Sequence, residues 1–316
     1  MNAALMGSVS SSWAALEGLI EAGVEVTGVL GVDESCAHKI SDYRPIGRLA
    51  KEHGLAFCGF ERVGEACVAE FLEAHRPDLL WVIGLSQSVP RRLLEIARAG
   101  GIGFHPTMLP EGRGRAPVAW TILRGARAAV SLFFLTYEPD AGDLVFQREV
   151  PVGPEDYSED LIARTNNALR EAVIELGPAI RSGHLPRTRQ DHGRATYYPK
   201  RTPEDGLIRW SDSTDWIYRL IRAAGRPYPG AFTWLGGEKI VVWRAEPVSD
   251  SKPGRAVFSE IGTDAPVPGT IVACGESGPV VETGDGLIRL TEMESPRLGD
   301  CGASVVAGVR LGGVGQ

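Results

Sequence analysis

The sequence predicts an α/β fold in which helices cover both faces of a parallel sheet, followed by a small β-barrel. Continuous apolar runs alternate with amphipathic segments over roughly the first 180 residues, as expected for strands buried on both faces. Residues 184–200 are rich in Pro, Arg, Thr and Tyr, which favours an ordered linker. From Gly206 onward, short β-prone runs lie between Gly, Pro and Asp turns, and this spacing predicts a small barrel.

The first strand and helix follow from the opening residues. An apolar run over 3–6 precedes Gly7 and several serines, and Trp13, Leu16 and Leu19 then recur at helical spacing until Gly23 ends the pattern. This order predicts a strand, a loop and a helix. By the same reasoning we predict strands over 24–30, 79–83, 102–104, 130–135 and 144–150, and helices over 46–53, 68–74, 91–99, 116–123 and 159–181.

The second part contains one predicted helix, over 214–224, and a series of short strands. We predict these strands over 232–235, 239–245, 269–273, 280–282 and 287–290. The change of pattern divides the chain into a first domain over 1–183, a linker over 184–205 and a C-terminal domain over 206–316.

Composition excludes several classes of protein. The 316 residues are 43% hydrophobic, which excludes a disordered chain, and the net charge of −7 disfavours a general polyanion binder. The start lacks a secretion signal, and the chain has no apolar run long enough to cross a bilayer, so we expect a cytoplasmic protein without a membrane partner. The cysteines form no Cys-x-x-Cys pair, so we expect reduced thiols and no metal. They are Cys36, Cys58, Cys67, Cys274 and Cys301.

Two loops carry the residue types that acid–base chemistry uses. His105 lies where a short strand passes into a loop of prolines, glycines and two arginines, and open α/β sheets bind ligands at such carboxyl ends. Asp140 lies in a turn between two predicted strands. An ordinary turn would explain Asp140 alone, but a carboxylate that orients an imidazole is the standard partner of a catalytic histidine. The serines after Gly7 lack a full glycine motif and are explained as helix caps.

These residues resemble those of the formyltransferases that use 10-formyltetrahydrofolate, the group of methionyl-tRNA formyltransferase and the nucleotide-sugar N-formyltransferases. The family pattern is Asn-x-His-x-Ser-x-Leu-Pro, then Arg-Gly, then an Asp-x-Gly turn. Here His105-Pro-Thr-Met-Leu-Pro110 and Arg113-Gly114 match the first part, and Asp140-Ala-Gly142 matches the second. The resemblance extends to Gly84-Leu-Ser-Gln-Ser-Val-Pro90 and to Tyr228-Pro-Gly-Ala-Phe232, so it covers nearly the whole chain.

The resemblance implies a Rossmann-like catalytic domain, an OB-like C-terminal β-barrel domain, and 10-formyltetrahydrofolate as the formyl donor, with no metal. It also implies that His105 and Asp140 are catalytic. The folate is expected against Leu85, Ser86, Gln87, Ser88 and Val89 and against the turn with Asp140 and Asp143. Thr107, Arg113 and Arg115 are the expected substrate-binding residues.

One residue departs from the family pattern. Gly103 occupies the position of the family's catalytic Asn, two residues before His105 and therefore on the same face of the strand. Losing an amide that stabilises an oxyanion commonly lowers the rate by ~10²–10³. Three explanations stay open: His105 acts as a cation in its place, a backbone N–H or a water enters the space beside Gly103, or the protein has little transferase activity.

The hypothesised reaction is the attack of an amine on the formyl carbon, with His105 moving the proton and Asp140 holding the ring in its tautomer. In methionyl-tRNA formyltransferases a basic loop after the second strand meets the tRNA. The corresponding residues here, 33–43, contain one lysine and three acids. We therefore favour a small-molecule amine, such as an amino sugar attached to a nucleotide, and expect no nucleic-acid partner.

The alternatives are a methionyl-tRNA formyltransferase, a formyltetrahydrofolate hydrolase for which Gly103 makes room for water, and a folate-binding protein without activity. The expected oligomeric state is a monomer or a homodimer.

Overall fold

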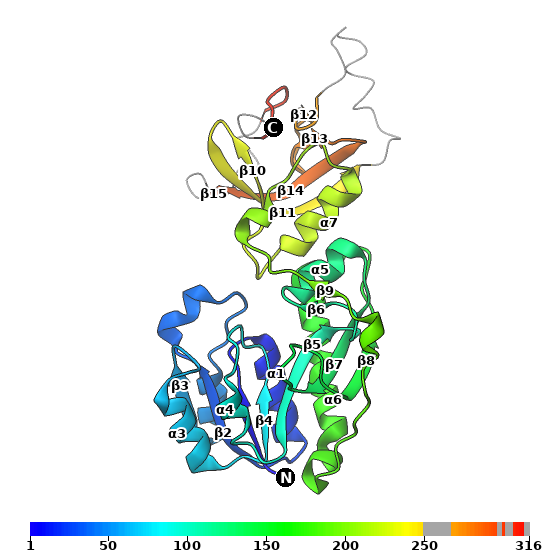
Figure 1. Cartoon of the computed structure of the whole chain (residues 1–316). Coiled ribbons are helices and arrows are strands. Elements are labelled where there is room, and N and C mark those ends of the chain that lie inside the picture. The colour runs from blue at the N-terminus through cyan, green and yellow to red at the C-terminus, as the bar shows by residue number, and fades with distance from the viewer. Residues whose placement is uncertain (249–266, 296–298, 301–305, 313–316) are drawn as a thin grey trace. The chain divides into compact units, whose positions relative to one another are not determined.

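The computed structural model describes residues 1–248, 267–295, 299–300 and 306–312. The chain divides into two compact units (Figure 1). The first contains Met1–Thr121, Ala126–Gly153 and Asp160–Lys200, and the second contains Ile122–Gly125, Pro154–Glu159 and Arg201–Gln316.

The first unit is built on a seven-stranded sheet with the strand order β3-β2-β1-β4-β5-β7-β8. The strands from β3 to β5 pair in parallel, whereas β7 pairs antiparallel with both β5 and β8. The strands are β1 (Ala3–Met6), β2 (Val26–Val32), β3 (Phe57–Phe60), β4 (Leu79–Val82), β5 (Gly100–Thr107), β7 (Ala128–Phe134) and β8 (Leu144–Val150). A separate pair, β6 (Arg113–Gly114) and β9 (Tyr197–Tyr198), joins the loop after β5 to the segment after the last long helix.

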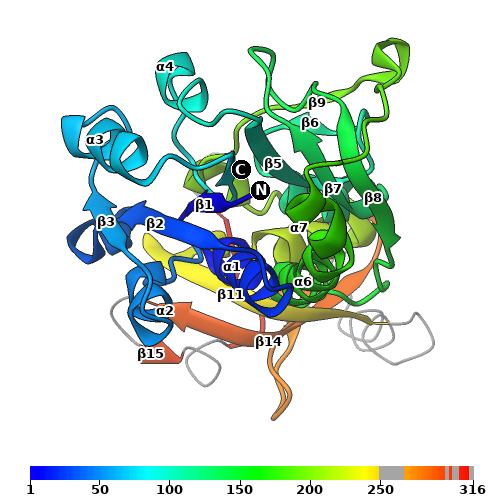
Figure 2. The ribbon, with the colours of Figure 1, turned by 90° about the horizontal axis from the view of Figure 1, so that it is seen from below.

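Helices cover both faces of this sheet. The helices of residues 1–182 are α1 (Ser10–Glu21), α2 (Ile46–Glu52), α3 (Ala66–His75), α4 (Arg91–Leu94), α5 (Pro117–Arg124) and α6 (Ser158–Ser182). Figure 2 shows α3 and α4 on one side of the sheet and α1, α2 and α6 on the other. Met6, Leu30 and Leu80 pack with Leu72 of α3 and Leu93 of α4 in one buried cluster. The central strands β1 and β4 are continuously apolar because helices cover both faces of the sheet there.

The second unit contains α7 (Thr214–Ala224) and a six-stranded sheet in which every pairing is antiparallel. The order is β10-β11-β14-β13-β12, and β15 pairs with β14. The strands are β10 (Ala231–Leu235), β11 (Glu238–Val248), β12 (Ile271–Ala273), β13 (Val280–Glu282), β14 (Leu287–Ser295) and β15 (Gly299–Asp300). The predicted fold class, a mainly parallel α/β domain with a separate antiparallel C-terminal sheet, is confirmed. The OB-like form of that sheet stays a prediction.

Several elements differ from their predicted bounds. The predicted helix over 91–99 is only the short α4, and the strand predicted over 102–104 extends to both sides as β5. Strand β3 was not predicted because Phe57 and Gly59 are exposed and the segment lacks a continuous apolar run. Residues 190–198, predicted as part of a linker, lie within the first unit and contribute β9 to it.

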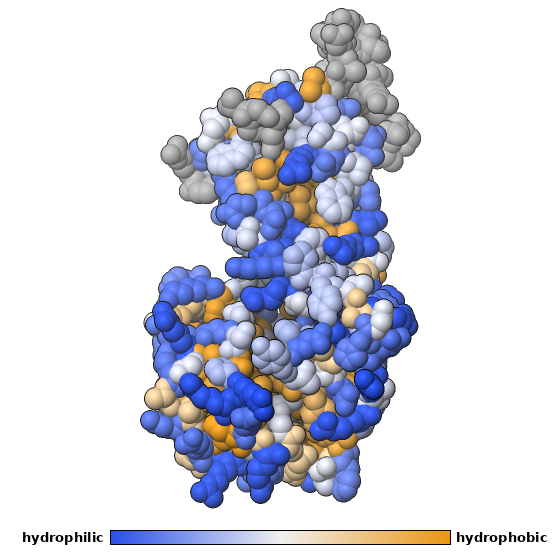
Figure 3. Space-filling view, viewed as in Figure 1, coloured by the Kyte–Doolittle hydropathy of each residue, from blue (hydrophilic) through white to orange (hydrophobic). Residues whose placement is uncertain are grey.

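The surface is mainly polar on the face shown in Figure 3, with apolar residues in small groups. Within the described ranges, no helix combines the length and the hydrophobicity that crossing a bilayer requires. Cys36, Cys58 and Cys67 are free thiols, and Cys301 lies outside the described residues.

Gly7 in the turn between β1 and α1 offers a test of this packing. A Cβ at Gly7 would overlap the carbonyl oxygen of Ile83. We expect Gly7→Ala to lower the free energy of unfolding by at least about 1–3 kcal/mol. The matched control is Gly64→Ala, where a Cβ would meet only Arg92 Nη2 at 4.0 Å. Its effect should stay within about 0.5 kcal/mol. Urea unfolding of both variants checks the prediction, and equal effects would contradict it.

Candidate active site

Strand β5 places His105 at the carboxyl end of the parallel part of the sheet. His105 is 5% exposed, and its Nε2 lies 2.8 Å from the carbonyl oxygen of Gly112. A carbonyl oxygen only accepts hydrogen bonds, so Nε2 carries a proton and donates it to Gly112. In the neutral ring, Nδ1 therefore has the free lone pair and is the nitrogen available for proton transfer.

Asp140 faces that second nitrogen. Its Oδ2 lies 3.8 Å from His105 Nδ1 and accepts a hydrogen bond of 2.9 Å from the backbone N–H of Gly114. The structure thus brings together the two residues that the sequence analysis paired. The expectation that Asp140 holds the tautomer needs correction, because the contact that fixes the tautomer comes from Gly112. At 3.8 Å the carboxylate acts on the ring through its charge.

The loop after β5 owes its shape to short polar contacts. The hydroxyl of Thr107 donates to the carbonyl oxygen of Glu111 at 2.8 Å, and the N–H of Gly112 donates to Thr196 Oγ1 at 2.8 Å. Gly112 has φ +73°, and a Cβ there would lie 2.7 Å from the ring of Tyr198. Only glycine fits this position, which places the carbonyl group that receives His105.

The place of the family's Asn is filled by apolar side chains. A Cβ at Gly103 would lie 2.8 Å from Phe133 Cζ and 2.8 Å from Leu135 Cδ2. Carbon atoms of Phe133 and Leu135 therefore lie where the side chain of that Asn would begin, and the three explanations for the missing amide stay predictions. Phe133 is 2% exposed and therefore packs rigidly.

The expected substrate-binding residues differ in their exposure. Thr107 is 2% exposed and Arg113 is 1% exposed, and the Thr107 hydroxyl and the Arg113 Nη groups form hydrogen bonds within the protein. These two side chains shape the loop, whereas Arg115 is exposed. The substrate-binding role of all three residues stays a prediction.

The expected folate-binding residues follow β4 and precede β8. Leu85 and Val89 are half-buried and pack against the core, whereas Ser86 and Ser88 are exposed. The Gln87 amide accepts from the N–H of Val63 at 2.9 Å and donates to the carbonyl of Glu61 at 2.9 Å, so it holds the loop after β3. Asp143 forms a long ion pair of 3.9 Å with Arg187.

Comparison with known proteins decides the family. The family model described as "Formyl transferase" matches residues 12–176, and the one described as "Formyl transferase, C-terminal domain" matches residues 200–304. The chain belongs to the formyl transferase family. This confirms the resemblance to that family.

Solved structures share the fold of this formyltransferase at low identity. HypX from Aquifex aeolicus in complex with tetrahydrofolic acid is 21% identical, with a TM-score of 0.65 over 95% of this chain and 45% of HypX. This chain therefore spans less than half the length of HypX. Methionyl-tRNA formyltransferase from Clostridium thermocellum is 20% identical, with a TM-score of 0.59 over 80% of this chain and 95% of that one. The sugar 3N-formyltransferase WlaRD, solved with dTDP and 5-N-formyl-THF, is 12% identical, with a TM-score of 0.64 over 94% and 98%.

The sequence did not reveal the polar network around the buried Arg113, beside Asp140. Arg113 Nη2 donates to Gln190 Oε1 at 2.8 Å and lies 3.1 Å from His192 Nδ1. Arg113 Nη1 donates to Tyr197 Oη at 3.1 Å and to Glu138 Oε1 at 3.3 Å. Residues 190–197 show no hydrophobic periodicity, so only the high density of polar and aromatic residues could have indicated their role.

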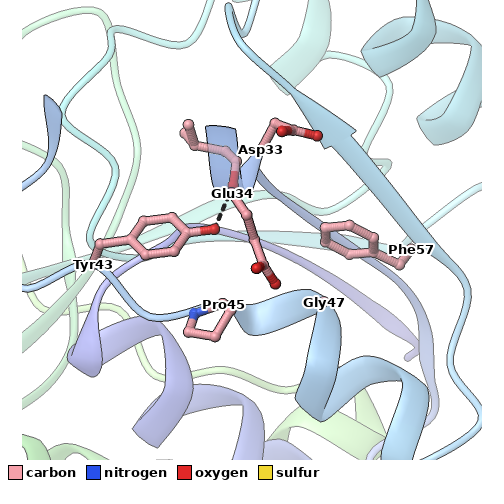
Figure 4. A pocket seen from close by; sticks show the side chains of 7 residues that line it. Asp33, Glu34, Tyr43, Pro45, Gly47 and Phe57 are labelled. Atoms are coloured by element: carbon pink, nitrogen blue, oxygen red, sulfur yellow. Dashed lines mark hydrogen bonds between the residues drawn. The ribbon is translucent and has the colours of Figure 1, made fainter. Parts of the chain in front are cut away.

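The chain also has a pocket of about 240 Å³ at the carboxyl end of β2, shown in Figure 4. Asp33, Glu34, Tyr43 and Phe57 line it, and the Tyr43 hydroxyl donates to the carbonyl of Val32 at 3.1 Å. The pocket is lined by neither His105 nor Asp140. The backbone N–H of Ser35 lowers the pKa of Asp33 below its ordinary value, so this carboxylate is negatively charged at neutral pH.

The start of α1 offers no open anion site. The backbone N–H of Ser10 donates to Asp42 Oδ2 at 3.2 Å, so a carboxylate of the protein itself caps this helix. Burial raises the pKa of Asp42 above its ordinary value. The geometry agrees with the interpretation of residues 7–10 as an ordinary β–α turn.

Gly103 provides a test of the apolar wall. We expect Gly103→Ala to lower the free energy of unfolding by about 1–3 kcal/mol, because its methyl group would push against Phe133 and Leu135. Leu135→Ala shortens the side chain that the new methyl group would push against. In the double variant Gly103→Ala/Leu135→Ala, the free energy of unfolding should therefore fall by less than the sum of the two single effects. Additive effects in urea unfolding would show that Leu135 does not fill the space.

Proposed function

We propose that this formyltransferase moves the formyl group of 10-formyltetrahydrofolate to a primary amine of a small molecule, with a nucleotide-linked amino sugar as the favoured class. The observation that carries the proposal is the pair of His105 Nδ1 and Asp140 Oδ2, 3.8 Å apart at the carboxyl end of β5. These are the residues that match the family's His and Asp.

The side chains of the two predicted folate loops fit a planar heterocycle with one polar edge. Leu85 and Val89 offer partly exposed apolar surface, and Ser86 and Ser88 offer exposed hydroxyls beside it. Folate binding by HypX and the presence of 5-N-formyl-THF with WlaRD support a folate donor.

His105 and Asp140 then have separate tasks in the proposed mechanism. His105 Nδ1 takes the proton from the attacking amine and returns it to the folate nitrogen that leaves. The negative charge of Asp140 stabilises the imidazolium that forms between these two steps. With no amide at Gly103, the imidazolium is also the group that stabilises the developing oxyanion.

The residues after β2 favour a small acceptor over tRNA. The one lysine of residues 33–43, Lys39, forms an ion pair of 3.1 Å with Glu61, and Glu34 pairs with Arg48 at 3.0 Å. Asp33 is charged and lines the neighbouring pocket. Binding an RNA stem needs several free cations against phosphates, and this surface presents paired cations and carboxylates.

The apolar wall beside Gly103 also bears on the hydrolase alternative. A hydrolase needs a water held beside the formyl carbon, and Phe133 and Leu135 offer it no hydrogen-bond partner. Transfer to an amine needs no such water, because the acceptor brings its own nucleophile.

Replacing His105 tests the catalytic assignment. We expect His105→Asn to lower the rate of formyl transfer by about 10²–10⁴, because the proton would lose its carrier. The matched control is His75→Asn, since His75 lies outside the site and bonds to the carbonyl of Phe71 at 2.7 Å. Release of tetrahydrofolate that depends on the acceptor is the measurement. Wild-type turnover by His105→Asn would refute the role of His105.

A panel of acceptors tests the proposed substrate class. With 10-formyltetrahydrofolate, we expect formamide formation on a nucleotide-linked amino sugar and none on methionyl-tRNA. The value of kcat/KM should depend weakly on salt, whereas an RNA acceptor would give a steep dependence. Rapid formate release without any acceptor would favour the hydrolase, and folate binding without turnover would favour the non-enzyme.

A further inference from the structure

We infer that Gln190 is a positioning residue that holds the Asp140 turn against His105, so that residues 190–198 form a clamp on the catalytic loop. The inference rests on the proposed roles of His105 and Asp140. It assigns a task in the reaction to residues that the motif does not include.

The Gln190 amide binds both ends of the Asp-Ala-Gly turn. Its Nε2 donates to the carbonyl oxygen of Asp140 at 2.9 Å and to that of Gly142 at 2.7 Å. The residue is 4% exposed, so water does not compete for these bonds. Asp140 has φ +57°, a left-handed conformation that costs a non-glycine residue free energy and needs such support.

Arg113 fixes which way this amide points. Its Nη2 donates to Gln190 Oε1 at 2.8 Å, so the oxygen of the amide faces the guanidinium and the NH₂ group must face the two carbonyls. The same guanidinium reaches Glu138, and the Tyr197 hydroxyl donates to Glu138 Oε1 at 2.8 Å. The turn is therefore held at Glu138, Asp140 and Gly142 from one side.

The clamp holds the histidine loop as well. The N–H of Arg113 donates to the carbonyl of Thr196 at 2.9 Å, and Thr196 Oγ1 accepts from Gly112, whose carbonyl receives His105. Because residues 190–198 bind both loops, they set the separation between the imidazole and the carboxylate.

This clamp lies in a part of the chain that neither family model covers. The two matched regions end at 176 and begin at 200, and Gln190 lies between them. The role therefore comes from the contacts of this chain and not from the family pattern.

The variant Gln190→Glu keeps the shape of the side chain and an oxygen for Arg113. It replaces the NH₂ group by an oxygen that faces the carbonyl oxygens of Asp140 and Gly142. The Asp140 turn should therefore move away from residue 190. We expect kcat to fall by about 10²-fold, the scale of a ~1 Å misplacement, with the KM of the donor changed much less. The N–H of Gly114, which donates to Asp140 Oδ2, should exchange with solvent faster, as measured by hydrogen-exchange NMR.

The matched control is Gln147→Glu. Gln147 Nε2 also makes two bonds, to the carbonyl of Leu109 and to Ser131 Oγ, both 2.9 Å long, but it does not touch the Asp140 turn. We expect this variant to leave the exchange of the Gly114 N–H unchanged. Equal Gly114 exchange in a folded Gln190→Glu variant and in the unchanged protein would overturn the inference.

Tyr197→Phe provides a second, milder test. Tyr197 is 55% exposed, so its change leaves folding intact, while Glu138 and Arg113 lose one shared partner. We expect a fall in kcat of about 2-fold to 10-fold and a smaller rise in Gly114 exchange. The exchange measurement needs no acceptor, so it tests the clamp even if the amine panel gives no product. No effect of either variant on Gly114 would refute the clamp.

Discussion

The buried guanidinium of Arg113 is the charge around which the site is arranged. Taking a cation out of water costs several kcal/mol unless hydrogen bonds and a counter-charge compensate it. Arg113 is 1% exposed, and its partners come from the turn before Asp140 and from residues 190–197. Its Nε has no partner among the described residues, so the two Nη groups carry the compensation. Each of these segments supplies a hydrogen-bond partner to the guanidinium, so the segments lie together around it. The position of Asp140 follows from this arrangement.

Much of the fold could be predicted because strands that are buried on both faces have continuous apolar sequences. Ala3–Met6 and Leu79–Val82 read as continuous apolar runs, and both lie in the middle of the sheet. The edge strand Phe57–Phe60 escaped prediction because half of it is exposed. Strand β5 extends well beyond its predicted bounds, since its glycines suppress the β signal although they allow close packing against Leu135.

Of the candidate site, the residues that belong to the family motif could be predicted. His105 and Asp140 could be paired because a carboxylate is the standard partner of a catalytic histidine and both residues match the family pattern. Gln190 could not be found, because it acts through two backbone carbonyls and such contacts leave no pattern in the sequence. The sequence also showed that an amide is missing at Gly103 but not what fills its place. That depends on how β5 and β7 pair, which brings Phe133 opposite Gly103.

The bond between His105 and Gly112 limits how protons can move. Since Nε2 is committed to a carbonyl, Nδ1 is the one ring nitrogen that can accept and return a proton. In the proposed mechanism, the attacking and the leaving nitrogen are both attached to the formyl carbon, so one Nδ1 can serve them in turn without rotation of the ring. Between the two proposed transfers, the ring would be a cation beside Asp140 and next to an apolar wall. The low dielectric of that wall strengthens its attraction for both Asp140 and an oxyanion. A fixed imidazole can thus combine the proton transfer with the charge stabilisation that a neutral amide supplies elsewhere in the family.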